Sequence, residues 1–89
     1  EQTVMQEFDY DKLMKILEQI KKYDSTFDTE YGEKAPELRS KIDEIETLVQ
    51  KRENPSRIKV LLADIKNLSI GVAGSLIASG IISIVSAIV

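Results

Sequence analysis

The chain has 89 residues, of which 43% are hydrophobic and 30% are charged, and its formal net charge at pH 7 is −3. Because it contains no cysteine and no histidine, it lacks disulfides, the usual zinc and haem ligands and the common nucleophile–base pairs. Its acidic balance, with both signs of charge mixed along the first two thirds, argues against nucleic-acid binding, which favours a basic surface.

The first predicted element is a helix over residues 9–31, preceded by a linker or frayed end over residues 1–8. Asp9 can cap its first turn, and Gly32 suits its C-terminal cap. Weak helix formers at residues 24–26 predict fraying or a bend there. We expect the aromatic residues of this helix to pack in the core, with a peptide-binding groove as the alternative. The apolar positions recur three or four residues apart, as on one helix face: Tyr10, Leu13, Leu17, Ile20, Phe27 and Tyr31.

A second helix is predicted over residues 36–53 and a third over residues 55–88. A proline stands at the start of each, where its fixed φ and missing N–H are tolerated, and Asn54 fits the cap of the third helix. The sequence shows no strand-like alternation. We therefore predict an all-α fold with a single domain over residues 9–89: a helical hairpin plus a long or kinked third helix, packed as a small helical bundle.

The uncharged segment over residues 67–89 is the most informative feature, because all 12 basic and 15 acidic side chains lie before it. Its length is about what a helix needs to cross a bilayer, and it also resembles a helix that is buried on every side. On a helical wheel, one face carries small residues and the opposite face carries isoleucines. Small residues allow close approach of a neighbouring helix, whereas the isoleucines need to be covered.

The length of the third helix leaves three ways to cover this segment. As a continuous helix of about 35 residues it would be roughly 50 Å long and would extend beyond its own hairpin. Either the chain bends at Gly71 or Gly74 and folds back, or a second chain covers the overhang, or lipid does.

We expect the second of these, a contact with a second copy or with another domain of the parent protein. The predicted interface comprises isoleucines and small residues of the tail: Ile70, Gly71, Ser75, Ile77, Ser79, Gly80, Ile81, Ser83, Ile84 and Ile88.

No residue pattern predicts a catalytic, metal-binding or cofactor-binding site. The acidic cluster of Asp24, Asp28 and Glu30 lacks the spacing of an EF-hand loop. Gly71 and Gly74 are not followed by the Lys and Ser/Thr of a phosphate-binding loop. We therefore expect a chain that is not an enzyme and takes no cofactor and no small-molecule substrate.

The alternative function is a membrane anchor or a membrane-inserting, pore-type tail. Arg57, Lys59 and Lys66 precede the uncharged segment, as expected of a tail anchor whose N-terminal side is cytoplasmic. Against this, the segment lacks the Trp or Tyr belt that marks membrane interfaces, and serines and glycines dilute its hydrophobicity. We expect a cytoplasmic protein, with membrane association as the alternative.

An Asn54-Pro55 break is followed by Ser56-Arg57-Ile58-Lys59 and then by a Gly- and Ala-containing apolar run over residues 67–82. From about residue 35 to the end, the chain resembles the C-terminal helical module of various uncharacterised bacterial proteins, including abortive-infection-type defence proteins. The resemblance implies an accessory module of a larger bacterial protein, possessing no catalytic residue and serving phage defence. It agrees with the chain's start at Glu1, from which we expect an excised piece of a longer protein or a processed chain.

Overall fold

Helices account for nearly all of the chain that the computed structural model describes, namely residues 9–72 and 74–87. No strand occurs in these two ranges, and the predicted all-α class is confirmed. The elements in chain order are α1 (Tyr10–Lys21), α2 (Asp24–Tyr31), the 3-10 turn η1 (Gly32–Lys34), α3 (Ala35–Lys51), α4 (Pro55–Ile70) and α5 (Leu76–Ser86).

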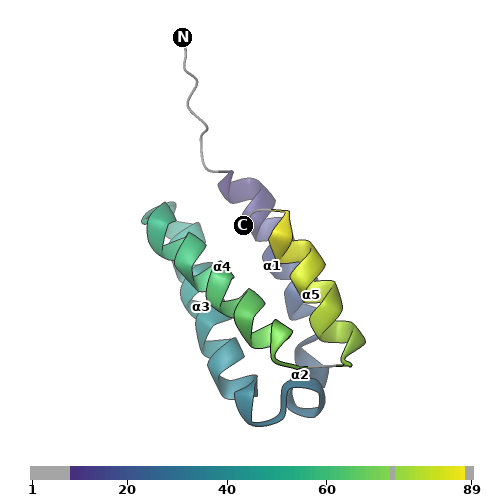
Figure 1. The fold of residues 1–89 in the computed structure, drawn as a ribbon. Helices are drawn as coiled ribbons and strands as arrows, with labels where there is room; N and C mark the ends of the chain where they lie inside the picture. The colour runs from purple at the N-terminus through teal and green to yellow at the C-terminus, as the bar shows by residue number, and fades with distance from the viewer. Residues whose placement is uncertain (1–8, 73, 88–89) are drawn as a thin grey trace.

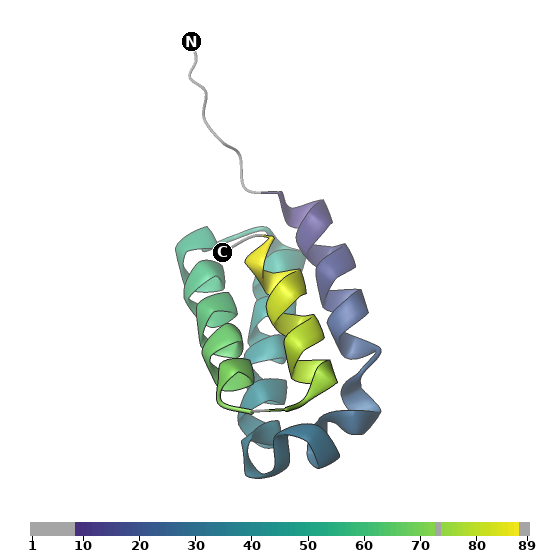
Figure 2. The same ribbon diagram turned by 45° about the vertical axis from the view of Figure 1, so that its right-hand side comes forward.

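The four longer helices, α1, α3, α4 and α5, form a small bundle in which consecutive members run in opposite directions (Figure 1). α3 packs against α4, α4 packs against α5, and α1 contacts both α3 and α5, which closes the ring. The short α2 crosses one end of the bundle, the end at which α4 is connected to α5 (Figure 2). It contacts α3 and α5 there.

Local sequence signals set several helix ends as predicted. The carboxylate of Asp9 accepts a hydrogen bond from the backbone N–H of Lys12 at 2.9 Å and caps α1. Asn54 caps α4 by accepting from the N–H of Arg57 at 3.3 Å. Gly32 ends α2 with a φ of 57°, a backbone conformation that favours glycine.

The core lies between the four bundle helices and takes apolar side chains from every helix. Burial of each large side chain stabilises the fold by about 1.5–3 kcal/mol. Those of α1 and α2 follow the apolar positions predicted for the first helix. The largest fully buried side chains are Phe27, Leu13, Leu17, Ile20, Leu38, Ile45, Ile58, Leu61, Leu62, Ile65, Ile81 and Val49.

The predicted first helix is two helices, because the chain turns between α1 and α2, just before the weak helix formers at residues 24–26. The guanidinium of Arg39 in α3 explains the direction of α2. It donates to the Asp24 carboxylate at 3.0 Å, to the Asp24 carbonyl at 2.8 Å and to the Asp28 carboxylate at 2.8 Å. It also lies 5.5 Å from the centre of the Phe27 ring. These contacts hold α2 against α3 rather than in line with α1.

The predicted third helix over residues 55–88 is also two helices, since α4 ends at Ile70 and α5 begins at Leu76. Gly74, between them, has a φ of 84°, which a right-handed helix does not allow. The chain folds back at this point, the first of the three arrangements considered above. The final two positions, 88 and 89, lie outside the described residues.

The phase of the apolar residues gives the physical reason for this reversal. If α4 and α5 were one helix, the buried face of α4 (Ile58, Leu61, Ile65) and that of α5 (Ala78, Ile81) would point roughly 160° apart. A continuous helix therefore cannot direct both faces into one core. Reversing the chain direction allows both to be buried in the same bundle.

Candidate interface on the C-terminal helix

Three of the isoleucines predicted to meet a second chain, Ile77, Ile81 and Ile84, are instead covered wholly or partly by the chain's own bundle. Ile81 has no exposed surface, and Ile77 and Ile84 are partly buried against the core. The helix that carries them, α5, packs with α1, α2 and α4. The prediction is corrected accordingly: while α5 stays in its bundle, Ile81 is not available to a partner, because the turn after α4 directs this face inward. Ile88 lies outside the described residues.

The outward face of α5 contains the small residues of the predicted interface. Ser79 and Ser83 are exposed, and Gly80 is partly exposed. A Cβ at Gly80 would meet no atom within 4 Å, so no helix of the same chain approaches closely there. Leu76, at the start of this face, is 86% exposed. The face therefore combines small residues, one large apolar side chain and no charge.

Exposed apolar side chains also mark the end of α4. Ile70, the last residue of α4, is 59% exposed, and Gly71 beside it is exposed. A Cβ at Gly71 would lie 2.6 Å from the ammonium nitrogen of Lys34. The ammonium group thus lies beside the C-terminal end of α4, where a positive charge interacts favourably with the helix dipole. Within the described residues, Ile70, Leu76 and Val60 are the large apolar side chains that are most exposed, and all belong to α4 and α5.

A buried hydrogen-bonded pair ties α2 to the end of α4. Ser69 donates to the carbonyl of Ile65, one turn earlier, at 2.9 Å. Its oxygen therefore accepts the second bond, and the hydroxyl of Tyr31 is the donor, at 2.5 Å. Burial raises the pKa of the Tyr31 hydroxyl above its ordinary value of 10.0. The pair is one link between α2 and the α4 side of the turn.

Ser75 has a structural role that the sequence interpretation missed. Its hydroxyl oxygen accepts from the N–H of Ala78 at 3.0 Å and so caps α5. The same hydroxyl donates to the carboxylate of Glu30 in α2 at 2.5 Å. It was predicted as an intermolecular contact, but it is buried within the chain. A Gly-Ser pair immediately before an apolar run is a helix-start signal that could have identified this cap.

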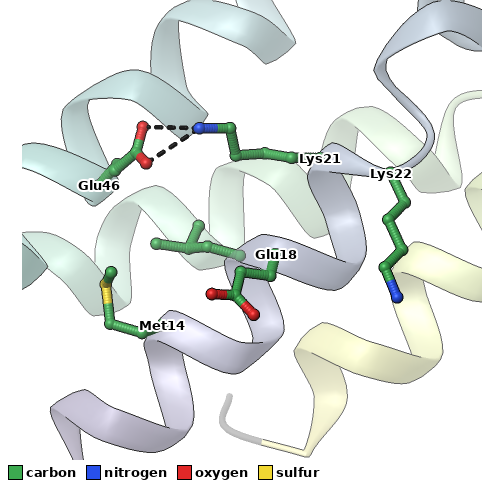
Figure 3. A pocket seen from close by; sticks show the side chains of 6 residues that line it. Met14, Glu18, Lys21, Lys22 and Glu46 are labelled. Atoms are coloured by element: carbon green, nitrogen blue, oxygen red, sulfur yellow. Dashed lines mark hydrogen bonds and ion pairs between the residues drawn. The ribbon is translucent and has the colours of Figure 1, made fainter.

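A surface depression of about 310 Å³ lies beside α1, with Met14 among the side chains that line it (Figure 3). The ammonium group of Lys21 donates to both carboxylate oxygens of Glu46, at 3.0 and 2.9 Å. The hydrogen bond with Glu46 raises the pKa of Lys21 above its ordinary value. Lys22 points away from this pair. The depression thus has an apolar wall and an ion pair whose members satisfy each other, which gives no chemistry for a reaction.

Two kinds of site are not found in the part of the chain that the structure describes. No group of three or more acidic side chains there is arranged to hold a metal ion. Within the same residues, no helix combines the length and the apolar character needed to cross a lipid bilayer.

Comparison with known proteins yields no match: the chain fits no protein-family model, no curated protein and no solved structure. The resemblance to bacterial defence proteins therefore stays a prediction, and the candidate interface is argued from its own geometry.

Proposed function

We propose that the chain is a non-enzymatic module that associates with a second copy of itself through α5 and the adjoining end of α4. The supporting observation is that Leu76, on the uncharged outward face of α5, is 86% exposed and that Ile70, at the adjoining end of α4, is 59% exposed. Ser79 and Ser83 continue this surface along α5. In keeping with the resemblance, we place the module in a larger bacterial protein whose sensing or catalytic part lies elsewhere, with phage defence as the process.

The contrast with the other helices favours this surface over the rest of the molecule. The outward face of α1 carries exposed Lys12, Lys15 and Glu18, and that of α3 carries exposed Glu37 and Asp43. Burying such charges without partners costs desolvation energy, and the centres of interfaces are accordingly poor in charge. The α5 surface can be buried without that cost.

The small residues determine which kind of partner fits. Serine and glycine let the backbone of a neighbouring helix approach closely, and serine hydroxyls can bond to the carbonyl one turn earlier in their own helix. A second α5 offers the same small, uncharged face. A two-fold arrangement of two copies would therefore be self-complementary.

Leu76→Glu tests the proposal with little risk to the fold. The side chain is almost fully exposed, and an acidic residue in the first turn of a helix is favourable for the helix dipole. Sedimentation velocity from micromolar to millimolar concentration should show a dimer for the unchanged chain and a monomer for Leu76→Glu. The matched control is Gln19→Glu, the same new charge at an exposed position of α1, which should leave association unchanged.

Two results would contradict the proposal. One is an unchanged chain that sediments as a monomer at every concentration. The other is equal association of the two glutamate variants, which would place the contact elsewhere.

The membrane alternative is distinguished by flotation with lipid vesicles. We expect the chain to stay at the bottom of the gradient with both neutral and anionic vesicles. Co-flotation that Leu76→Glu abolishes would instead favour lipid as the cover of this surface.

A further inference from the structure

α5 is held in its bundle by different interactions from the other helices. Ion pairs join α1 to α3 (Lys21–Glu46), α2 to α3 (Arg39–Asp24) and α3 to α4 (Arg57–Glu44 and Lys41–Asp64). α5 has no charged residue. The cap residue of α5, Ser75, is linked to α2 by a hydrogen bond to Glu30. Apolar contacts therefore supply nearly all of its attachment.

The connection between α4 and α5 is short and depends on a glycine. Gly74 has a φ of 84°, and a Cβ there would meet no atom within 4 Å. The free-energy cost of replacing Gly74 with alanine would thus come from the backbone conformation and not from crowding. In an extended connection, by contrast, alanine is accommodated without strain. A substitution at Gly74 therefore penalises the tight reversal specifically.

The two apolar side chains at this connection are exposed in the single chain. Ile70 precedes it and Leu76 follows it, with 59% and 86% of their surfaces exposed. They lie at the end of the bundle that α2 crosses (Figure 2). If two copies met end to end at this point, the Ile70 and Leu76 side chains of both copies would be covered.

From these observations we infer that two copies of the chain exchange their α5 helices, so that α5 of each copy occupies the α5 position in the other bundle. This inference rests on the proposed function, because it specifies how α5 mediates self-association. The partner is a second copy, since the site that α5 leaves has the shape of α5 itself. Exchange keeps the contacts of Ile81 and the Ser75–Glu30 bond, now between chains, and changes only the connection.

The reach of the connection sets the geometry of the exchanged dimer. From Ile70 to Leu76 an extended chain spans at most about 20 Å. The connected ends of the two bundles must therefore face each other closely. Ile70 and Leu76 then lie at the contact between the copies, which gives them the cover that they lack in the single chain.

Gly74→Ala tests the exchange, and Gly32→Ala is its matched control. Both glycines have positive φ, and a Cβ at either would meet no atom within 4 Å, but Gly32 is the first residue of η1 and is not part of the connection between α4 and α5. Strain at Gly74 should favour the extended connection roughly fivefold in each chain, and the dimer contains two chains. Sedimentation should thus show a dimerisation constant roughly 25-fold higher for Gly74→Ala and unchanged for Gly32→Ala.

Distance measurement reports the exchange itself. Because the chain has no cysteine, Val60→Cys and Ser86→Cys introduce two labels at exposed positions of α4 and α5. In the single bundle these helices are neighbours about 10 Å apart. After exchange, the labels of one chain should be roughly 40 Å apart or more. Mixing labelled with excess unlabelled chain restricts the signal to distances within one chain.

The outcomes separate this inference from the proposed function. Dimers with the long distance, enriched by Gly74→Ala, support both. Dimers that keep the short distance overturn the exchange but leave self-association in place. Absence of dimers in every variant overturns both.

Discussion

The buried bond between Tyr31 and Ser69 makes a quantitative prediction about how α2 holds the end of α4. Ser69→Ala removes the acceptor and leaves the Tyr31 hydroxyl buried without a partner, since Tyr31 is only 4% exposed. An unsatisfied buried hydroxyl costs about 1–3 kcal/mol. The better helix propensity of alanine offsets about 0.5 kcal/mol of this. We expect Ser69→Ala to lower the free energy of unfolding by about 0.5–2.5 kcal/mol, with a midpoint of about 1.5 kcal/mol.

Tyr31→Phe should cost less. It removes the donor, but the Ser69 hydroxyl keeps its own acceptor, the carbonyl of Ile65. The loss is then that of one ordinary hydrogen bond, about 1 kcal/mol. In the double variant no orphaned donor remains. Its free energy of unfolding should therefore be about 1 kcal/mol below that of the unchanged chain, and hence above that of Ser69→Ala alone.

Urea unfolding followed by circular dichroism at pH 7 measures the free energy of unfolding of the unchanged chain, the two single variants and the double variant. The key comparison is between the double variant and Ser69→Ala. If the two single losses simply add in the double variant, the hydroxyl of Tyr31 is not paired with Ser69 in the folded chain and the reasoning fails. The control is the slope of the free energy of unfolding against urea concentration. An unchanged slope shows that each variant exposes the same amount of surface on unfolding.

Two further predictions concern stability. Gly80→Ala should raise the free energy of unfolding by about 0.5–1 kcal/mol, because Gly80 lies inside α5 and a Cβ there meets no atom within 4 Å; a loss in urea unfolding would mean that α5 packs more closely than described. The raised pKa of Tyr31 implies that the unfolded chain releases this proton at lower pH than the folded chain, so stability from this group is full below pH 10.0 and falls as pH rises above it. Between pH 8 and 11, the free energy of unfolding should fall more steeply for the unchanged chain than for Tyr31→Phe. Parallel pH profiles of the two chains would contradict the raised pKa of Tyr31.

Local signals in the sequence predicted much of the fold. Asp9 and Asn54 cap helices as expected, because a cap needs only a short polar side chain beside the first free N–H groups. Gly32 ends a helix because of its own backbone freedom. The apolar face of α1 could be predicted because residues three or four apart share one face of a helix. Each of these features depends on neighbours in sequence alone.

The exposure of the residues in the candidate interface was predictable only in part, because exposure depends on the whole bundle. Ser79 and Ser83 were correctly grouped on one face of the helix, and the structure leaves that face outward. Ile81 was assigned to a partner, yet it is fully buried in its own chain. The wheel showed that Ile81 needed cover but could not say whose side chains would provide it. Ser75 was assigned by its small size, whereas its position before α5 makes it a cap.

The sequence by itself determined an all-α chain, its caps and the need to cover the uncharged segment. Only the tertiary structure decided where that segment goes. The apolar faces before and after Gly74 point in opposite directions along a continuous helix, and one core can bury both only if the chain reverses between them. Similarly, Arg39 turned α2 away from α1 through contacts that join residues 11 and 15 positions apart. Both decisions depend on groups that are distant in sequence and meet only after the helices have packed.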